Sequence, residues 1–307
     1  MNAPSYHEPV LVEEVLSVWV TDPEARYLDG TVGGGGHAEA LLSRFPGTCL
    51  VGLDQDPEAI EAATLRLGKF WDRVTLVRSD FASMESALAG IPGKPVCGVL
   101  LDLGVSSRQL DAPERGFSYS AEGPLRLVLD RDAPTDARDF LKSVTEEELR
   151  GIFQNLADLP RAGRAARAVL REMHAGRIST TTDLADVLRS AGQGSPRRLS
   201  QAFQALRMAV NDEMGSLRRG MATAARMLPT GGTLAVISFE SVTDREVKRT
   251  FRPQRQGRPM PGEVDPDPIW DVVTRGAVRP GEDEVRRNPR SRSARLRAAR
   301  RTSHAAV

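Results

Sequence analysis

The sequence predicts an α/β protein with a doubly wound, mostly parallel sheet and an α-helical insertion. Short, nearly continuous apolar runs alternate with helical segments, which is typical of a parallel sheet covered on both faces. An acidic residue stands at or just after the end of the first four runs. Between about residues 106 and 200 the sequence has helical patterns but no clear strand, so we expect a helical insertion there.

Composition excludes several classes of protein. The chain has 307 residues, 40% hydrophobic and 27% charged, which is ordinary for a globular protein. A net charge of +1 gives no general attraction to nucleic acid, so any RNA contact must come from local clusters. Residues 1–9 do not have the basic-then-apolar pattern expected of a signal peptide, and no apolar run reaches the length expected of a membrane helix. Cys49 and Cys97 are expected to be buried thiols in a reducing compartment, so we expect a cytoplasmic protein.

In the first third, a short amphipathic helix is expected after His7-Glu-Pro-Val-Leu-Val12. Strands are predicted over residues 26–29, 48–53, 74–78 and 96–102, because each is a short apolar run. Asp56 and Pro57 are suited to the cap and first turn of a helix after the second strand.

A glycine-rich turn follows the first strand. The stretch Asp29-Gly-Thr-Val-Gly-Gly-Gly-Gly-His37 has four consecutive glycines and leads into a helical segment. Glycine permits sharp turns and close approach to a ligand, and a helix start offers free N–H groups. A nucleotide-like cofactor is therefore expected here. The alternative is a strand–helix connection that is merely rich in glycine.

The acids at the strand ends are Asp29, Asp54, Asp80 and Asp102. In open α/β sheets the ligand crevice lies outside the carboxyl ends of the strands. A single acid in such a place is more often a helix cap or turn residue. Because four occupy equivalent places, we expect them to form one rim.

The middle of the chain is expected to contain an ordered loop over residues 109–119 and helices over 136–142, 146–155, 161–175 and 182–190. Arginine is dense in this part. A solvated helix face is the usual explanation of such charge runs, and contact with RNA is the alternative. The arginines concerned are Arg161, Arg164, Arg167, Arg171, Arg177, Arg189, Arg197 and Arg198.

The α/β pattern then resumes. A long helix is predicted over residues 203–227, a strand over 233–239, a helix over 242–252, a proline-rich loop over 253–268 and a strand over 269–274. In the basic tail, Ala294, Leu296 and Ala298 alternate with arginines, which is a strand period. The tail could thus form an antiparallel edge strand with a basic outer face suited to a phosphate backbone. A frayed basic terminus explains the pattern equally well.

Two cofactors compete for the glycine turn. Gly33-x-Gly35-x-x-Ala38 satisfies a loose dinucleotide fingerprint, with Asp54 at a fair distance for a ribose contact, so an NAD-dependent dehydrogenase is one hypothesis. His37 after the glycines, and Asp80-Phe81 placed to bracket an adenine, favour S-adenosylmethionine instead. Core packing at a strand end is the alternative role of Phe81.

Ten motifs are spread over nearly the whole chain. They are His7-x-Pro-Val-Leu11, Asp29-Gly-Thr-x-Gly-Gly-Gly-Gly-His37, Gly52-Leu-Asp-x-Asp-Pro57, Leu100-Leu-Asp-Leu-Gly-Val-Ser-Ser107, Gln109-Leu-Asp111, Arg115-Gly-Phe-Ser118, Phe203-Gln-Ala-Leu-Arg207, Val210-Asn-Asp-Glu213, Ile237-Ser-Phe239 and Asn288-Pro-Arg-x-Arg-Ser293. In these motifs the chain resembles the MraW (RsmH) family of bacterial 16S rRNA (cytosine-N4)-methyltransferases.

The resemblance implies a class I S-adenosylmethionine-dependent methyltransferase with a Rossmann-like seven-strand core. The core would span residues 1–108 and 206–307, and residues 109–205 would form the helical insertion that recognises RNA. The expected partner is 16S rRNA in the small ribosomal subunit, with the target a cytosine in the decoding centre; the oligomeric state stays open, a homodimer being one option. The resemblance places S-adenosyl-L-methionine on Gly35, Gly36, His37, Asp54, Phe81, Asp102 and Gln109.

This sequence also departs from the family pattern. Arg126 and Val128 replace a usual acid and arginine, Leu159-Pro160 stands where Glu-Arg is usual, and Glu240 replaces a histidine. All lie in or next to the expected RNA side. A relative that binds S-adenosylmethionine and RNA without catalysis, or that acts on a different substrate, is therefore a second hypothesis.

The expected chemistry needs no metal, because the methyl carbon carries a sulfonium leaving group. The protein mainly has to align the cytosine amine with the S–CH₃ bond, after the base is extruded from any stack. Hydrogen bonds that accept from the amine would raise its nucleophilicity. Asp102, the Ser106/Ser107 turn and Asn211 are all candidates, and no catalytic base is assigned.

Overall fold

The computed structural model describes residues 8–252 and 268–304. His7 and most of the predicted proline-rich loop lie outside the described residues. The chain divides into two compact units. The core unit comprises residues 1–104 and 216–307, and the helical unit comprises residues 105–215.

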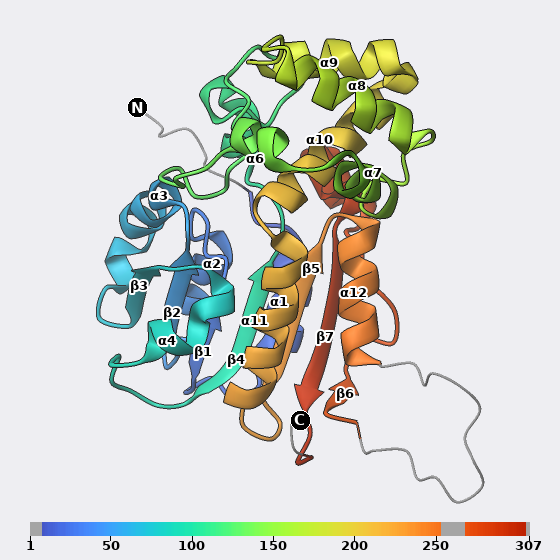
Figure 1. Ribbon diagram of the computed structural model, residues 1–307. Coiled ribbons are helices and arrows are strands. Elements are labelled where there is room, and N and C mark those ends of the chain that lie inside the picture. The colour runs from blue at the N-terminus through green and yellow to red at the C-terminus, as the bar shows by residue number, and fades with distance from the viewer. Residues whose placement is uncertain (1–7, 253–267, 305–307) are drawn as a thin grey trace, which may run out of the picture. The chain divides into compact units, whose positions relative to one another are not determined.

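The core unit contains a seven-stranded sheet with the order β3-β2-β1-β4-β5-β7-β6 (Figure 1). Neighbouring strands from β3 to β5 are parallel, while β7 is antiparallel to both β5 and β6. This arrangement confirms the predicted α/β class. The strands are β1 (Arg26–Asp29), β2 (Cys49–Asp54), β3 (Val74–Arg78), β4 (Val96–Asp102), β5 (Thr233–Ser238), β6 (Trp270–Val272) and β7 (Arg295–Arg301).

Helices cover both faces of this sheet. Trp19 of α1 and Leu41 of α2 belong to one apolar cluster with Leu100 of β4 and Ile237 of β5. On the other face, α11 and α12 lie in front of β4, β5 and β7 in Figure 1. The helices of this unit are α1 (Val12–Trp19), α2 (Gly36–Arg44), α3 (Pro57–Leu67), α4 (Met84–Leu88), α11 (Glu213–Met227, which begins in the helical unit), α12 (Ser241–Phe251) and α13 (Glu282–Arg287).

The basic tail forms the predicted antiparallel strand, but its predicted place at the sheet edge is wrong. β7 lies between β5 and β6, where Leu296, Ala298 and Ala299 are buried. Two of its arginines also bond to other parts of the core unit. Arg297 forms a two-point ion pair with Asp244 of α12, with N···O distances of 2.7 and 3.1 Å. Arg301 donates to the carbonyl of Ala225, so β7 presents no uniform basic outer face.

The predicted helix over residues 203–227 is two helices. The structure has α10 (Pro196–Val210) and α11, separated at Asn211 and Asp212. Asp212 has φ 45°, in the left-handed region. The Asn211 side chain donates to the carbonyl of Leu127, which is distant in the chain, and to that of Arg207. The bond to Arg207 is local and of the kind that competes with helix continuation. The spacing of apolar residues along the sequence does not reveal such a break.

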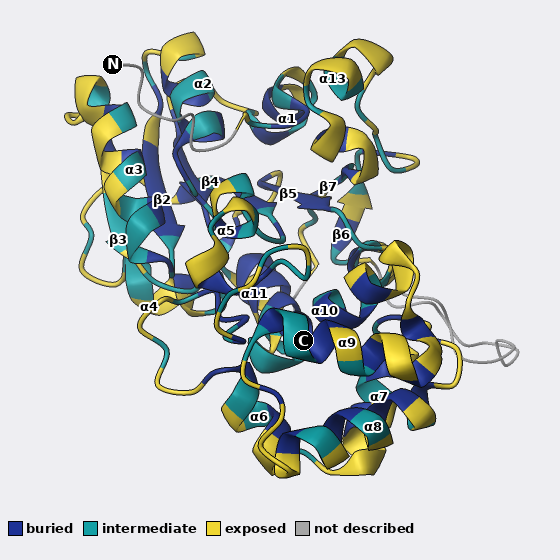
Figure 2. Cartoon of the chain, turned by 90° about the horizontal axis from the view of Figure 1, so that it is seen from above, coloured by how far each residue is buried: buried dark blue, intermediate teal, exposed yellow. Residues whose placement is uncertain are grey.

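The helical unit packs its helices around a separate apolar core that includes Leu141, Phe153, Val169, Leu184 and Phe203. Buried residues line the inner sides of α7, α8 and α10 in Figure 2, and exposed residues the outer sides. The expected loop over residues 109–119 is partly helical. The elements are α5 (Ser107–Asp111), a 3₁₀ turn (Pro113–Arg115), α6 (Ala137–Ser143), α7 (Glu146–Asn155), α8 (Ala162–His174), α9 (Thr181–Leu188), a π-helical turn (Arg189–Gln193) and α10.

The prediction of two buried thiols is wrong. Cys49 is exposed and Cys97 is half-buried. Cys49 is the first residue of β2 and Cys97 the second of β4, so both lie at the amino end of the sheet rather than in its middle. Among the described residues, no helix is long and apolar enough to cross a membrane.

Candidate cofactor site

The first strand and its turn are tied to β4 through Thr31. The Asp29 carboxylate accepts the backbone N–H of Thr31 at 3.1 Å. The Thr31 hydroxyl oxygen accepts the backbone N–H of Asp102 at 2.6 Å. Gly30 N–H donates to the Leu100 carbonyl. The ends of β1 and β4 are thus held side by side, and the register pairs Asp29 with Leu100.

The glycines of the turn serve different purposes. Gly35 has φ 80°, and a Cβ there would lie 3.2 Å from Leu67 of α3. A Cβ on Gly36 would lie 2.9 Å from the ring of Pro9. Gly33 has φ 51°, but a Cβ there would meet only the Thr31 carbonyl oxygen, at 3.9 Å. Gly36 is therefore required by packing within the protein, and Gly35 by its positive φ together with the contact to Leu67, whereas a Cβ on Gly33 would point into open space.

Asp54 joins the end of β2 to the same turn. Its Oδ2 accepts the backbone N–H of Gly33 at 2.9 Å, and its Oδ1 accepts the N–H of Asp56 at 2.9 Å. Burial raises the pKa of Asp54 to about 6, although these backbone hydrogen bonds oppose the shift. Asp56 in turn caps α3 by accepting from Glu58 N, which confirms the cap predicted from Asp56-Pro57.

Asp102 and His37 face each other at the end of β4. His37 Nδ1 lies 3.8 Å from Asp102 Oδ2, and the two side chains are 6% and 14% exposed. His37 Nε2 lies 2.8 Å from the carbonyl oxygen of Val10. Asp102 Oδ1 is buried and has no hydrogen-bond partner among the residues that the structure describes. Such an oxygen calls for a donor.

Asp29 and Asp102 are unusual acids because their surroundings disfavour the charged form. Burial raises the pKa of Asp102 to about 7. Burial raises the pKa of Asp29 to about 8, and the charges of Asp102 and Asp54 push it in the same direction against the Thr31 hydrogen bond. With Asp54, the core unit therefore gathers three acids with raised pKa values around one turn, the kind of cluster found at functional sites.

Asp80 has a local role. β3 ends at Arg78, and the Asp80 side chain caps the 3₁₀ turn Phe81–Ser83 by accepting from Ala82 N. Its part in a four-acid rim stays a prediction. Phe81 is half-buried. A Cβ on Gly220 of α11 would lie 2.6 Å from its ring, so the ring packs directly over that glycine.

Gln109 and Asn211 belong to the helical unit. Gln109 forms a capping box with Ser106, accepting Ser106 N–H at 2.9 Å, and the Ser106 hydroxyl accepts Gln109 N–H. The Asn211 amide nitrogen donates to Leu127 and Arg207 carbonyls, and its oxygen accepts Leu129 N–H. Both donors of Asn211 are thus used inside the helical unit. Of the expected amine acceptors, Asp102 has an unused buried oxygen.

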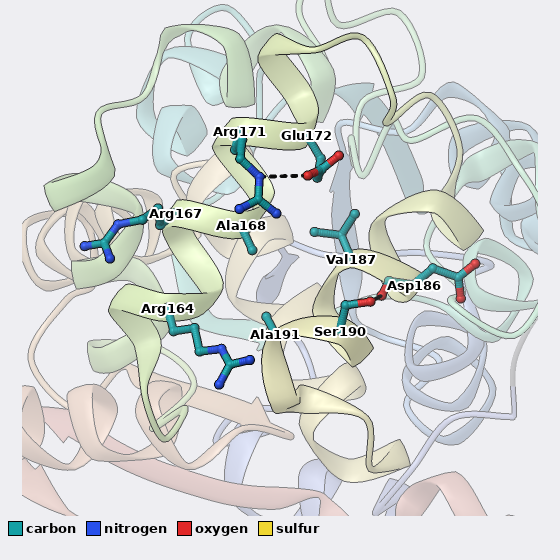
Figure 3. A pocket seen from close by; sticks show the side chains of 9 residues that line it. All are labelled: Arg164, Arg167, Ala168, Arg171, Glu172, Asp186, Val187, Ser190 and Ala191. Carbon is teal, nitrogen blue, oxygen red and sulfur yellow. Dashed lines mark hydrogen bonds and ion pairs between the residues drawn. The ribbon is translucent and has the colours of Figure 1, made fainter.

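Half of the eight arginines noted in the helical insertion form ion pairs with acids among the described residues. A hollow of about 410 Å³ between α8 and α9 is lined by Arg164, Arg167 and Arg171 together with Glu172 and Asp186 (Figure 3). Arg167 pairs with Glu146, Arg171 and Arg177 share Glu172, and Arg189 pairs with Asp186. For these four residues, a solvated, ion-paired helix face describes the charge run.

No group of three or more histidine, cysteine, aspartate or glutamate side chains is arranged to hold a metal ion in residues 8–252 and 268–304.

One family model and three relatives that share a name match nearly the whole chain. The MraW methylase family matches residues 4–302. The chain is 42% identical over 315 residues to "Ribosomal RNA small subunit methyltransferase H" of Chlorobaculum parvum, covering 97% of this chain and 98% of that protein. It is 44% identical over 319 residues to the protein of the same name from Chlorobium luteolum, covering 97% of each chain, and 42% identical over 310 residues to that of Heliobacterium mobile, covering 96% and 98%. With its three-acid cluster at the end of the sheet and this match over nearly its whole length, the chain belongs to the MraW methylase family.

Proposed function

We propose that the protein transfers a methyl group from S-adenosyl-L-methionine to the exocyclic N4 amine of a cytidine in the decoding centre of 16S rRNA. The observation that carries the proposal is the cluster of Asp29, Asp54 and Asp102 around the glycine turn, in a chain similar over nearly its whole length to proteins named as small-subunit rRNA methyltransferases. The small ribosomal subunit is then the partner, and the cytoplasm the expected location.

The cluster suits this cofactor chemically. S-adenosylmethionine carries an ammonium group, two ribose hydroxyls and an adenine, and it supplies a methyl carbon bound to a sulfonium. The Asp54 carboxylate, which holds the turn, can also accept hydrogen bonds from ribose hydroxyls, and the open side of Gly33 leaves room for close approach of the cofactor. We assign cofactor binding to Gly35, Gly36 and His37 at the turn and to Asp54, Phe81 and Asp102 beside it. The family resemblance also assigns Gln109 to cofactor binding.

The protein contributes to catalysis by aligning the cytosine amine and by the charge of the Asp102 carboxylate. Asp102 Oδ1 is a buried acceptor at the end of β4, so it can take a hydrogen bond from an N–H of the cytosine amine. Such a bond orients the nitrogen and increases its electron density, and positioning of this kind can supply a large share of a rate enhancement. The proton released from the amine after transfer goes to solvent or to this carboxylate.

The NAD-dependent dehydrogenase has no support in this fold. The dinucleotide-binding fold has the strand order 3-2-1-4-5-6, whereas this sheet has β7 inserted antiparallel between β5 and β6. Membership in the MraW methylase family agrees with the methyltransferase alternative.

A relative that binds cofactor and RNA without catalysis is the second candidate, because of the departures at Arg126, Val128, Leu159, Pro160 and Glu240. The structure gives two of them a packing role, since Val128 and Leu159 are 3% and 4% exposed in the helical unit. Arg126 donates to the carbonyl of Arg131. Val128 and Leu159 are therefore apolar where charged side chains are usual in the family. This favours a change in the packing of the helical unit over the loss of a functional site.

Mass spectrometry of decoding-centre nucleosides in a deletion strain tests the proposal. We expect N4-methylcytidine to be lost on deletion and restored by the intact gene. Restoration should fail with Asp102→Asn and succeed with Asp72→Asn, an exposed residue outside the cluster. Unchanged N4-methylcytidine in the deletion strain would favour the non-catalytic candidate.

A further inference from the structure

The hydrogen-bond geometry of His37 determines which of its ring nitrogens carries a proton. Its Nε2 lies 2.8 Å from the carbonyl oxygen of Val10. A carbonyl oxygen can only accept, so Nε2 must carry the hydrogen. In neutral His37, the nitrogen that faces Asp102 Oδ2, at 3.8 Å, is therefore Nδ1 with its lone pair.

An ionised Asp102 opposite neutral His37 would place two acceptors face to face in a buried site. A proton on either partner removes this repulsion, on Nδ1 as an ion pair or on the carboxyl as a neutral acid. The other oxygen of Asp102 has no partner among the described residues to stabilise a negative charge. The pair therefore favours a state with one additional proton.

The neighbouring charges reinforce this preference. Asp29 from β1 and Asp54 from β2 stand at the same end of the sheet, and the charges of Asp102 and Asp54 raise the pKa of Asp29 after the larger effect of burial. His37 comes from α2, and Asp56 at the start of α3 adds a further negative charge that raises the pKa of Asp54. Without a nearby cation, ionising all three carboxylates in one buried cluster is unfavourable in free energy.

We propose that the Asp102–His37 pair holds a proton in the cofactor-free protein and releases it to solvent when S-adenosylmethionine binds. This inference rests on the cofactor of the proposed function. S-adenosylmethionine carries a net positive charge from its sulfonium, ammonium and carboxylate groups. S-adenosylhomocysteine, the product, has lost the sulfonium and is neutral overall. The pair thus makes binding selective for the charged cofactor over its spent form, and His37 acts as a positioning residue for Asp102.

The direction of the pH effect follows from linkage. A cation that favours ionised Asp102 lowers its pKa from the value of about 7 in the free protein. Binding of S-adenosylmethionine then releases protons below about pH 7, and its affinity rises with pH by up to about tenfold per pH unit for each proton released. The neutral product releases fewer protons, so its affinity rises less.

Isothermal titration calorimetry of the full chain tests this inference. S-adenosylmethionine and S-adenosylhomocysteine are titrated across the pH range below and above neutrality, in buffers with different ionisation enthalpies, which count the protons released. We expect greater release with S-adenosylmethionine and an affinity ratio between the two ligands that grows with pH. Equal release for both ligands, or a constant ratio, would overturn the inference.

Variants test whether the Asp102–His37 pair, rather than a general loss of folding, causes the difference in proton release. Asp102→Asn and His37→Gln should both reduce the difference in proton release between the ligands, and thermal unfolding monitors folding. Glu39→Gln is the matched control, because Glu39 is on α2 but pairs with Lys69 and Arg66; it should behave as the unaltered protein. If either pair variant folds and keeps the full difference, the pair is not its source. Absence of S-adenosylmethionine binding at every pH would instead contradict the proposed function.

Discussion

The backbone N–H of Gly33 donates a 2.9 Å hydrogen bond to Oδ2 of Asp54. The glycine turn after β1 and the acid at the end of β2 are therefore one structure, although they are 21 residues apart in the chain. Any ligand group that binds Asp54 must do so while this carboxylate also holds the turn in place.

Asp54→Ala should reduce affinity for S-adenosylmethionine by more than about tenfold, because it removes an acceptor for the ribose and a hydrogen bond of the turn, each worth about 1 kcal/mol or more. Calorimetric titration of the purified variant measures the effect. Asp72→Asn changes an exposed acid after α3 and should leave affinity unaltered. Retention of affinity within a few-fold in Asp54→Ala would show that Asp54 does not bind the cofactor.

Gly36→Ala should destabilise the protein by about 1–3 kcal/mol, because its Cβ would lie within 3.0 Å of three atoms of the Pro9 ring. Gly68→Ala is a matched control. Gly68 has φ −53°, and a Cβ added there would meet no other atom within 4 Å, so this variant should be neutral or stabilising by up to about 1 kcal/mol. Urea unfolding measures both changes. Similar free energies of unfolding for the two variants would mean that the Pro9 ring moves to accommodate the added methyl group.

Gly220→Ala should displace Phe81, because a Cβ there would lie 2.6 Å from one ring carbon and 2.8 Å from another. If Phe81 packs on the adenine, cofactor affinity should fall as it does in Phe81→Ala. Calorimetry on both variants and on the double variant tests the link. Additive losses would contradict it, since residues that act through one contact are expected to be non-additive.

Asp29→Asn should stabilise the cofactor-free protein at pH 8 by up to a few kcal/mol and by clearly less at pH 5. Burial raises the pKa of Asp29 from 3.8 to about 8, so the folded state holds a proton that the unfolded state has lost. The contribution of Asp29 to stability therefore falls as pH rises from about 4 towards 8. Denaturant unfolding at both pH values measures the difference, and an equal effect at both would exclude this titration as the cause.

The apolar pattern predicted the first five strands within about one residue, because strands buried on both faces are nearly continuous apolar runs. It also predicted the Asp56 cap and most helices of the insertion. It could not predict the break at Asn211, since that asparagine is held by Leu127 and Leu129, 84 and 82 residues away.

For the candidate site, the sequence by itself determined the glycine turn and the acids at the ends of β1, β2 and β4, because these follow directly from local order along the chain. Only the tertiary structure decided that Gly36 packs on Pro9. It likewise decided that β7 lies inside the sheet and that His37 is oriented by Val10 towards Asp102. Each of these depends on contacts between distant segments, and a strand or helix period carries no information about which segment becomes the neighbour.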